Sequence, residues 1–190
     1  MKFERLTKEQ LKKIYVERMT EDFPEAELKP LEAMYDMMDR DCYEALAVLD
    51  DEGVIGYSLM TKIPGQNYLL LDYLSIYKEY RQCGYGSKVL EGLKVYYSGK
   101  TIFIESENPD YIDEKSHDTA VKRVGFYEKN GVKDTGVLTR IWTVPYINYM
   151  LGDLNLSKEQ AQKALEVIYE TMIPNKSTRD KMIEIPQRTF

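Results

Sequence analysis

The stretch YRQCGYGSKVL, Tyr80 to Leu90, holds two glycines one residue apart. The preceding segment NYLLLDYLSIY, residues 67–77, is nearly all apolar, as in a strand buried on both faces. After the glycines, apolar residues recur at helical spacing as far as residue 97. The order is therefore strand, glycine turn, helix. The first turn of such a helix directs N–H groups toward one point, where an anion such as phosphate is stabilised.

Gly84 and Gly86 let the backbone approach an oxygen atom without a Cβ in between, and Arg81 could add a charge-assisted contact. The spelling is not that of a P-loop, and Val89 stands where a dinucleotide fingerprint requires a third glycine. An isolated pair of glycines more often marks a plain tight turn. The surrounding sequence therefore has to decide.

Composition predicts an ordinary globular protein. The chain has 190 residues, 43% hydrophobic and 31% charged, which suits one domain over residues 1–190. It shows no apolar window of about 18 residues and no signal peptide at its start, so we expect a cytoplasmic protein without membrane association. A net charge of -6 disfavours nucleic-acid binding.

Cysteine and histidine are scarce. Cys42 and Cys83 form no CxxC pair, and His117 is the only histidine. We therefore expect no metal site, no disulfide framework and no Ser-His-Asp triad.

The remaining pattern alternates helices and strands, which predicts a mixed α/β fold. Thr7 and Gln10 are placed as a capping box for the first helix, and Pro30 precedes the second, which brings Leu31, Met34 and Met38 together. Residues 50–53 form a turn between two strands of a hairpin. The predicted strands cover residues 43–49, 54–62, 67–77, 101–106, 136–143 and 146–151, and the helices 7–19, 30–40, 87–97, 119–129 and 157–172. The last of these is an amphipathic helix capped at Ser157.

Two ordered motifs resemble the GNAT superfamily of N-acetyltransferases. The run from Arg81 to Gly86 matches its signature of Arg or Gln, two residues, Gly, one residue, then Gly or Ala, and GFYEKNGV at 125–132 is similar to its FYEKLGF segment. The resemblance covers residues 6–151, with a helical extension from about 153 to 190. It implies a GNAT fold, a central, mostly antiparallel sheet with a splayed parallel strand pair, flanked by helices. Gln82, Cys83 and Lys78 depart from the usual spelling.

The resemblance implies acetyl-CoA as cosubstrate. Main-chain groups of Leu74, Ser75 and Ile76 would bind the pantetheine arm, and the N–H of Ile76 would polarise the thioester carbonyl. The pyrophosphate would be held by the loop after Arg81, at Gln82, Cys83, Gly84, Tyr85, Gly86 and Ser87. Cys83 has no chemical role in this scheme.

Acetyl transfer in this family usually goes directly to an amine, so a general base and a general acid remain to be assigned. Tyr127 occupies the family position of the acid that protonates the departing sulfur, although position alone would favour a packing role. Glu105 is the predicted base, acting through water, with Glu107 as the alternative, because residues two apart on a strand share a face. An exposed ion-paired carboxylate explains either glutamate equally well.

The region 21–41 is rich in acidic residues and would wall the acceptor site in this fold. A cationic amine would be attracted there, although a solvated acidic helix face explains the pattern too. We predict an N-acetyltransferase acting on a primary amine of a small molecule. The alternatives are a protein amine as acceptor, a catalytically weak acyl-CoA sensor, and an interaction protein whose helix at 157–172 docks a partner or a second copy in a homodimer.

Overall fold

The computed structural model describes residues 1–51 and 53–185, and the chain divides into two compact units. The first unit comprises residues 1–64 and 71–96, and the second comprises residues 65–70 and the chain from 97 onward. Strand β4, Tyr68–Ile76, contributes residues to both. The predicted turn at 50–53 includes Glu52, which lies outside the described residues.

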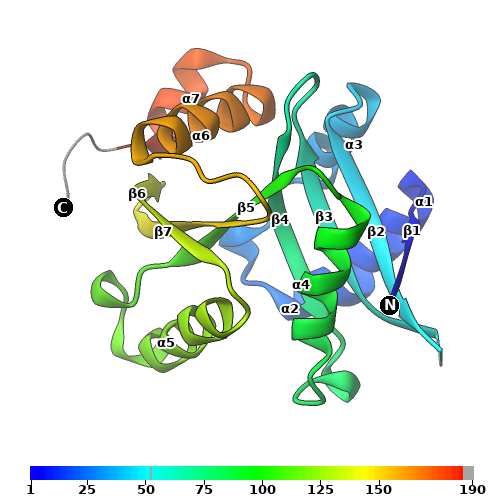
Figure 1. The fold of residues 1–190 in the computed structure, drawn as a ribbon. Helices are drawn as coiled ribbons and strands as arrows, with labels where there is room; N and C mark the ends of the chain where they lie inside the picture. Colours follow the sequence, from blue (N-terminus) through cyan, green and yellow to red (C-terminus); the bar gives the residue numbers. More distant parts are fainter. Residues whose placement is uncertain (52, 186–190) are drawn as a thin grey trace. The chain divides into compact units, whose positions relative to one another are not determined.

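The first unit is built on strands in the order β1-β2-β3-β4 (Figure 1). The antiparallel pair β2, Tyr43–Asp50, and β3, Gly53–Lys62, confirms the predicted hairpin. An additional edge strand β1, Lys2–Arg5, pairs with β2. Its four residues KFER contain one apolar side chain, so no alternating pattern marked it in the sequence.

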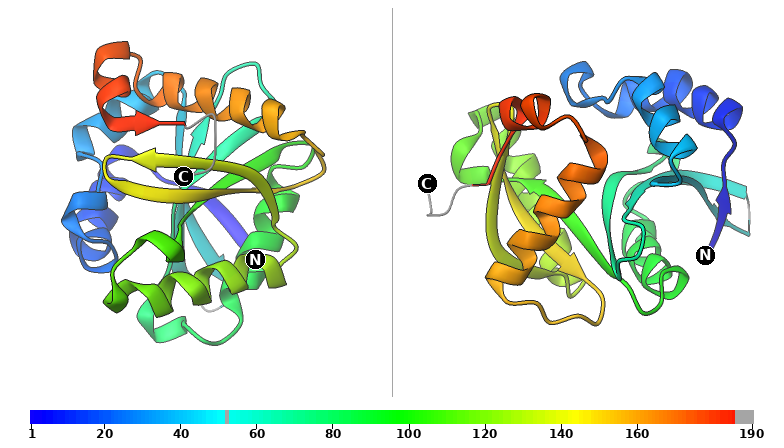
Figure 2. Two further views of the ribbon diagram at one scale, coloured as in Figure 1. Left: turned by 90° about the vertical axis from the view of Figure 1, so that its left-hand side faces the viewer. Right: turned by 90° about the horizontal axis from the view of Figure 1, so that it is seen from above.

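Helices cover both faces of these strands (Figure 2). One face carries α1, Lys8–Ile14, a π-helical turn, Tyr15–Met19, α2, Thr20–Asp22, and α3, Leu31–Asp39; the other carries α4, Tyr85–Tyr96. The capping box of Thr7 and Gln10 is present. Helix α3 begins after Pro30 but buries Met34 and Met37, whereas Met38, which the sequence placed in the core, is half-buried.

In the second unit the strand order is β4-β5-β7-β6-β8, with β4 and β5 as the parallel pair and β5-β7, β6-β7 and β6-β8 as antiparallel pairs. The strands are β5, Thr101–Glu107, β6, Lys133–Ile141, β7, Val144–Leu151, and the short β8, Ile183–Glu184. This mixed α/β arrangement, antiparallel apart from one parallel pair, is the fold class that the sequence predicted.

Three helices complete the second unit: α5, Glu114–Lys129, α6, Lys158–Met172, and α7, Lys176–Met182. Helices α5 and α6 lie on opposite faces of the strands (Figure 2). Contacts agree, because α5 touches Tyr149 while α6 touches Thr139, a partner of the neighbouring Asn148. Adjacent strand residues face opposite sides.

Among the boundaries that differ from the prediction, those of α5 and β6 have a clear physical reason. Helix α5 begins five residues earlier, capped by Asp113, because its first turn is polar and carries no apolar periodicity. Strand β6 begins at Lys133 and not at residue 136, with a bulge between Asp134 and Val137 that interrupts the alternation. Helix α6 has the predicted cap and buries its apolar stripe within its own unit, which favours packing over docking.

Candidate active site

The turn after β4 has the backbone geometry of an anion-binding loop. Gln82 and Gly84 have φ values of 65° and 78°, in the left-handed region, with Cys83 at negative φ between them. Alternation of this kind turns successive N–H groups toward one concave side. The conformation of Gln82 costs a non-glycine residue on the order of 1 kcal/mol, and such strained residues are often found in functional loops. The pair of left-handed residues around Cys83 is therefore the geometry of an anion-binding nest.

The beginning of α4 adds further donors to this loop. The first hydrogen bond of the helix runs from the N–H of Lys88 to the carbonyl of Gly84, at 3.4 Å. The N–H groups of Tyr85, Gly86 and Ser87 precede it and have no carbonyl in the helix to bind. Together with the positive end of the helix dipole, they favour a phosphate oxygen. The predicted pyrophosphate-binding residues therefore lie together at one helix start.

Arg81 makes contacts that the sequence did not indicate. Its Nε donates to the carbonyl of Ile76 at 2.7 Å, and Nη2 donates to Asp22 at 2.6 Å and to the hydroxyl of Ser75 at 3.1 Å. Asp22 also accepts from the hydroxyl of Tyr57 at 2.8 Å. The guanidinium is thus held against β4 and α2, and a phosphate contact would have to replace these bonds.

The backbone of β4 presents Leu74 and Ile76 away from β3. The carbonyl of Ser75 faces Gly56 of β3, and the N–H of Tyr77 donates to Ile55 of β3. Because N–H and C=O of one strand residue point to the same side and neighbours alternate, the polar groups of Leu74 and Ile76 point to the opposite side. Binding of an extended ligand arm requires this orientation, which Leu74 and Ile76 have. Ser75, which the sequence placed with them, faces β3 and does not have it.

Glu105 and Glu107, equivalent in the sequence, have different surroundings. Glu105 accepts a hydrogen bond from the phenol of Tyr169 on α6. Glu107 forms an ion pair with Arg123 of α5 at 3.3 Å, so its charge is compensated. Their partners come from helices on opposite faces of the strands, although the two glutamates are only two residues apart.

Tyr127 lies near the end of α5 and is buried. Its ring centroid is 5.8 Å from that of Tyr149, and burial raises the pKa of its phenol, opposed in part by the charge of Arg123. The phenol therefore keeps its proton at neutral pH, as an acid must. Tyr127 and Glu105 are not brought into contact; they lie on opposite faces of the same strands.

Several polar residues beside these groups were missed by sequence reasoning. Asp22 accepts from Arg81, the phenol of Tyr57 donates to Asp22, and the phenol of Tyr169 donates to Glu105. Tyr169 follows Leu165 by four residues in the apolar stripe of α6, so its spacing is that of a core residue and gave no signal of a polar contact.

The acidic region at 21–41 is largely paired with nearby basic side chains. The region contains eight Asp and Glu residues. Ion pairs are formed by Glu21, Asp22, Asp36, Asp39 and Asp41. Their partners are Lys78, Arg81, Arg40, Lys8 and Lys62. The region is thus closer to a paired, solvated face than to a concentrated negative wall.

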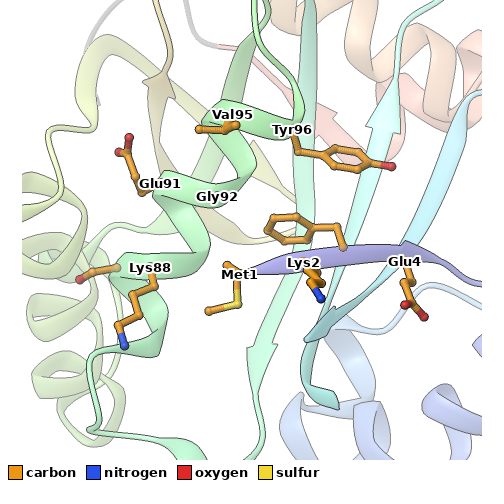
Figure 3. A pocket seen from close by; sticks show the side chains of 10 residues that line it. Met1, Lys2, Glu4, Lys88, Glu91, Gly92, Val95 and Tyr96 are labelled. Carbon is orange, nitrogen blue, oxygen red and sulfur yellow. The ribbon is translucent and has the colours of Figure 1, made fainter. Parts of the chain in front are cut away.

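A hollow of about 890 Å³ lies between β1 and α4 (Figure 3). It forms beside the contact of Phe3 with Gly92, where a Cβ would lie 2.9 Å from the ring. Val95 and Tyr96 line its upper part. Of its lining residues, Ser87 alone belongs to the predicted site. The hollow is mostly apolar and holds none of the proton-transfer candidates.

The described residues contain neither a cluster of metal-binding side chains nor a helix able to span a membrane. Over residues 1–51 and 53–185, no group of three or more His, Cys, Asp or Glu side chains could hold a metal ion. Within the same part of the chain, no helix is both long and apolar enough to cross a membrane.

The model of the acetyltransferase (GNAT) family matches residues 8–131, about two thirds of the sequence. The chain belongs to the GNAT family of acetyltransferases. This confirms the predicted family and places the protein among the acyltransferases. The matched region contains the loop from Arg81 to Ser87, Glu105 and Tyr127, and it ends before β6, β7 and α6.

Solved structures share the fold of this GNAT chain. A GNAT-family protein from Bacteroides thetaiotaomicron has a TM-score of 0.73 at 20% identity, covering 91% of this chain and 98% of its own. A spermidine N-acetyltransferase from Vibrio cholerae, in complex with CoA and spermine, has a TM-score of 0.57 at 13% identity, covering 79% of this chain and 94% of its own. The aminoglycoside 6'-N-acetyltransferase from Enterococcus faecium has a TM-score of 0.52 at 20% identity, covering 80% of this chain and 96% of its own. No curated protein sequence matches the chain significantly.

Proposed function

We propose that this GNAT protein transfers an acetyl group from acetyl-CoA directly to a primary amine of a small molecule. The observation that carries the proposal is the loop from Gln82 to Ser87, where left-handed residues and the start of α4 combine their N–H groups. An anion with several oxygens, such as a pyrophosphate, satisfies donors arranged in this way.

The β4 backbone supports the same proposal. Leu74 and Ile76 would bind the pantetheine arm through polar groups that point away from β3, as an added strand would. The cosubstrate supplies the acetyl group as a thioester. The N–H of Ile76 would donate to the thioester oxygen as it gains negative charge, because a fixed donor stabilises that charge. Arg81 would hold the Ile76 peptide in place through its bond to the Ile76 carbonyl.

Glu105 and Tyr127 would carry the two proton transfers. Glu105 would accept a proton from the attacking amine through water as the N–C bond forms, and Tyr127 would give a proton to the sulfur as the C–S bond breaks. Glu107 is the weaker candidate because Arg123 already compensates its charge.

For the acceptor, a small amine is the simplest proposal. Solved structures with a similar fold include a spermidine N-acetyltransferase and an aminoglycoside N-acetyltransferase. The paired acidic residues at 21–41 give no special support to a polycation, so we do not restrict the acceptor to polyamines.

The test begins with calorimetric titration of acetyl-CoA into the wild type, Gly84→Asp and Gly99→Asp. Gly84 and Gly99 are matched, with φ of 78° and 79° and no atom within 4 Å of an added Cβ. Both variants carry the same backbone strain and the same new charge, but only Gly84→Asp places that charge in the loop. We expect Gly84→Asp to lose binding at least tenfold and Gly99→Asp to bind like the wild type.

Release of free CoA thiol is then followed with a panel of primary amines. Amine-dependent release by the wild type would support the transferase. Binding without release under any amine would favour the acyl-CoA sensor, and release only with peptide amines would favour a protein acceptor. Equal losses in the two glycine variants would refute the role of the loop.

A further inference from the structure

Glu105 lies in a polar cluster on the α6 face of the second unit. Asn148 of β7 is its register partner, and the amide of Asn148 donates to the hydroxyl of Thr139 on β6 at 3.0 Å. Asn148 and Thr139 are fully buried, and the side-chain oxygen of Asn148 has no hydrogen-bond partner among the described residues. Buried polar groups usually serve a specific contact, because leaving them unpaired is costly.

Tyr169 covers this cluster from α6. Its ring is 1% exposed, and its phenol donates to Oε1 of Glu105 and lies 3.3 Å from the hydroxyl of Thr139. Burial, followed by the charge of Glu105, raises the pKa of Tyr169 well above its ordinary value. The proton therefore stays on the phenol, which leaves Glu105 as the charged acceptor.

We propose that Tyr169 is a positioning residue that keeps the Glu105 carboxylate ionised and fixed in orientation for its work as general base. The proposal rests on the proposed function for the role of Glu105 and adds a residue outside the region matched by the family model. A hydrogen bond donated to a carboxylate favours its charged form, and a rigid donor on a packed helix limits its rotation.

Two further ionisable groups lie on the strands that carry or adjoin Glu105, namely Tyr146 and Glu107. Tyr146 of β7 is near enough to Tyr169 to contribute to its raised pKa. Glu107 lies on the same strand but is paired with Arg123 of α5. Neither replaces the phenol of Tyr169 as the donor to Oε1 of Glu105.

The test is Tyr169→Phe, which removes the hydroxyl and retains the ring. Tyr43→Phe is the matched control, because Tyr43 is 3% exposed and its phenol donates to a carboxylate, Asp72, at 2.6 Å. Both variants lose one buried phenol-carboxylate bond, so both should lose similar stability in urea. Titration of the Glu105 carboxyl carbon by NMR then reports its ionisation without any need for activity.

We expect the Glu105 midpoint to rise by about one pH unit in Tyr169→Phe and to stay unchanged in Tyr43→Phe. The apparent pKa of the acid limb in the pH profile of kcat/KM for the amine should rise by the same amount, while KM for acetyl-CoA stays constant. An unchanged NMR midpoint would overturn the inference. The base assignment is tested separately by Glu105→Gln: full activity in that variant would remove the general base from the proposed function, and with it the catalytic part of this inference.

Discussion

Gly56 is the residue whose replacement tests most directly how β4 is positioned. An ideal Cβ on Gly56 would overlap the carbonyl oxygen of Ser75 and lie 3.1 Å from the Cα of Ile76. Both obstacles are backbone, so they cannot rotate away as a side chain would. Gly56→Ala must therefore separate β3 from this end of β4, by roughly 1 Å if the overlap is to be relieved to ordinary contact at about 3.5 Å.

The displacement should affect stability and catalysis to different extents. Crowding of this kind costs about 1–3 kcal/mol of unfolding free energy. The N–H of Ile76, the proposed donor to the thioester oxygen, would move with its strand, and a misplacement of about 1 Å can lower kcat on the order of 100-fold. Binding of acetyl-CoA should change less, because the loop at Gln82–Ser87 is untouched.

The assay pairs urea denaturation with thiol release and compares Gly56→Ala with Gly125→Ala. A Cβ on Gly125 meets no atom within 4 Å, and the residue lies inside helix α5. That control should therefore gain about 0.5–1 kcal/mol of stability. If Gly56→Ala kept wild-type kcat while losing the expected stability, the spacing of β3 and β4 would not position the reacting group, and the assignment of Ile76 would fail.

Four further outcomes are expected. Arg81→Met should weaken the binding of acetyl-CoA and of acetyl-pantetheine equally, about tenfold, since Arg81 contacts β4. If calorimetry showed a loss of affinity for acetyl-CoA alone, Arg81 would be a phosphate ligand. Tyr127→Phe should lower kcat about tenfold with KM unchanged, whereas a proportional rise in KM would exclude the acid role. Burial raises the pKa of Tyr149 to about 12, so the urea midpoint should fall between about pH 10 and 12, where the unfolded chain loses its proton first; a flat midpoint would contradict this. Leu165→Ala in α6 should cost about 2–5 kcal/mol, and a smaller loss would mean that α6 is not part of the core.

The sequence predicted those parts of the fold that local chemistry determines. The capping boxes at Thr7 and Ser157 and the glycine turn after β4 all lie where their residues indicated. The polar first turn of α5 and the bulge near Gly136 carry no periodicity, so the boundaries there were missed. Strand β1 is held by pairing with β2, a contact that the four residues KFER do not encode by themselves.

The candidate site shows the same division between local and distant information. The candidate loop at residues 82–87 is one contiguous stretch, so the sequence could single it out, although it gave no sign of the left-handed conformation at Gln82. The partner of Arg81 comes from 59 residues away and that of Glu105 from 64. Contacts over such separations depend on tertiary packing, which no window of sequence reports.

Separation of Glu105 from Glu107 illustrates how packing can assign chemistry that spacing leaves open. Both glutamates lie on β5, and alternation alone makes them equivalent. Arg123 forms an ion pair with Glu107, whereas the phenol of Tyr169 on α6 donates a hydrogen bond to Glu105. A base must keep its negative charge available to a proton, which a neutral donor permits better than a cation does. Helix α6 therefore does more than fill the core: it supplies the contact that distinguishes the two carboxylates, and Tyr169→Phe should reveal it where Tyr43→Phe does not.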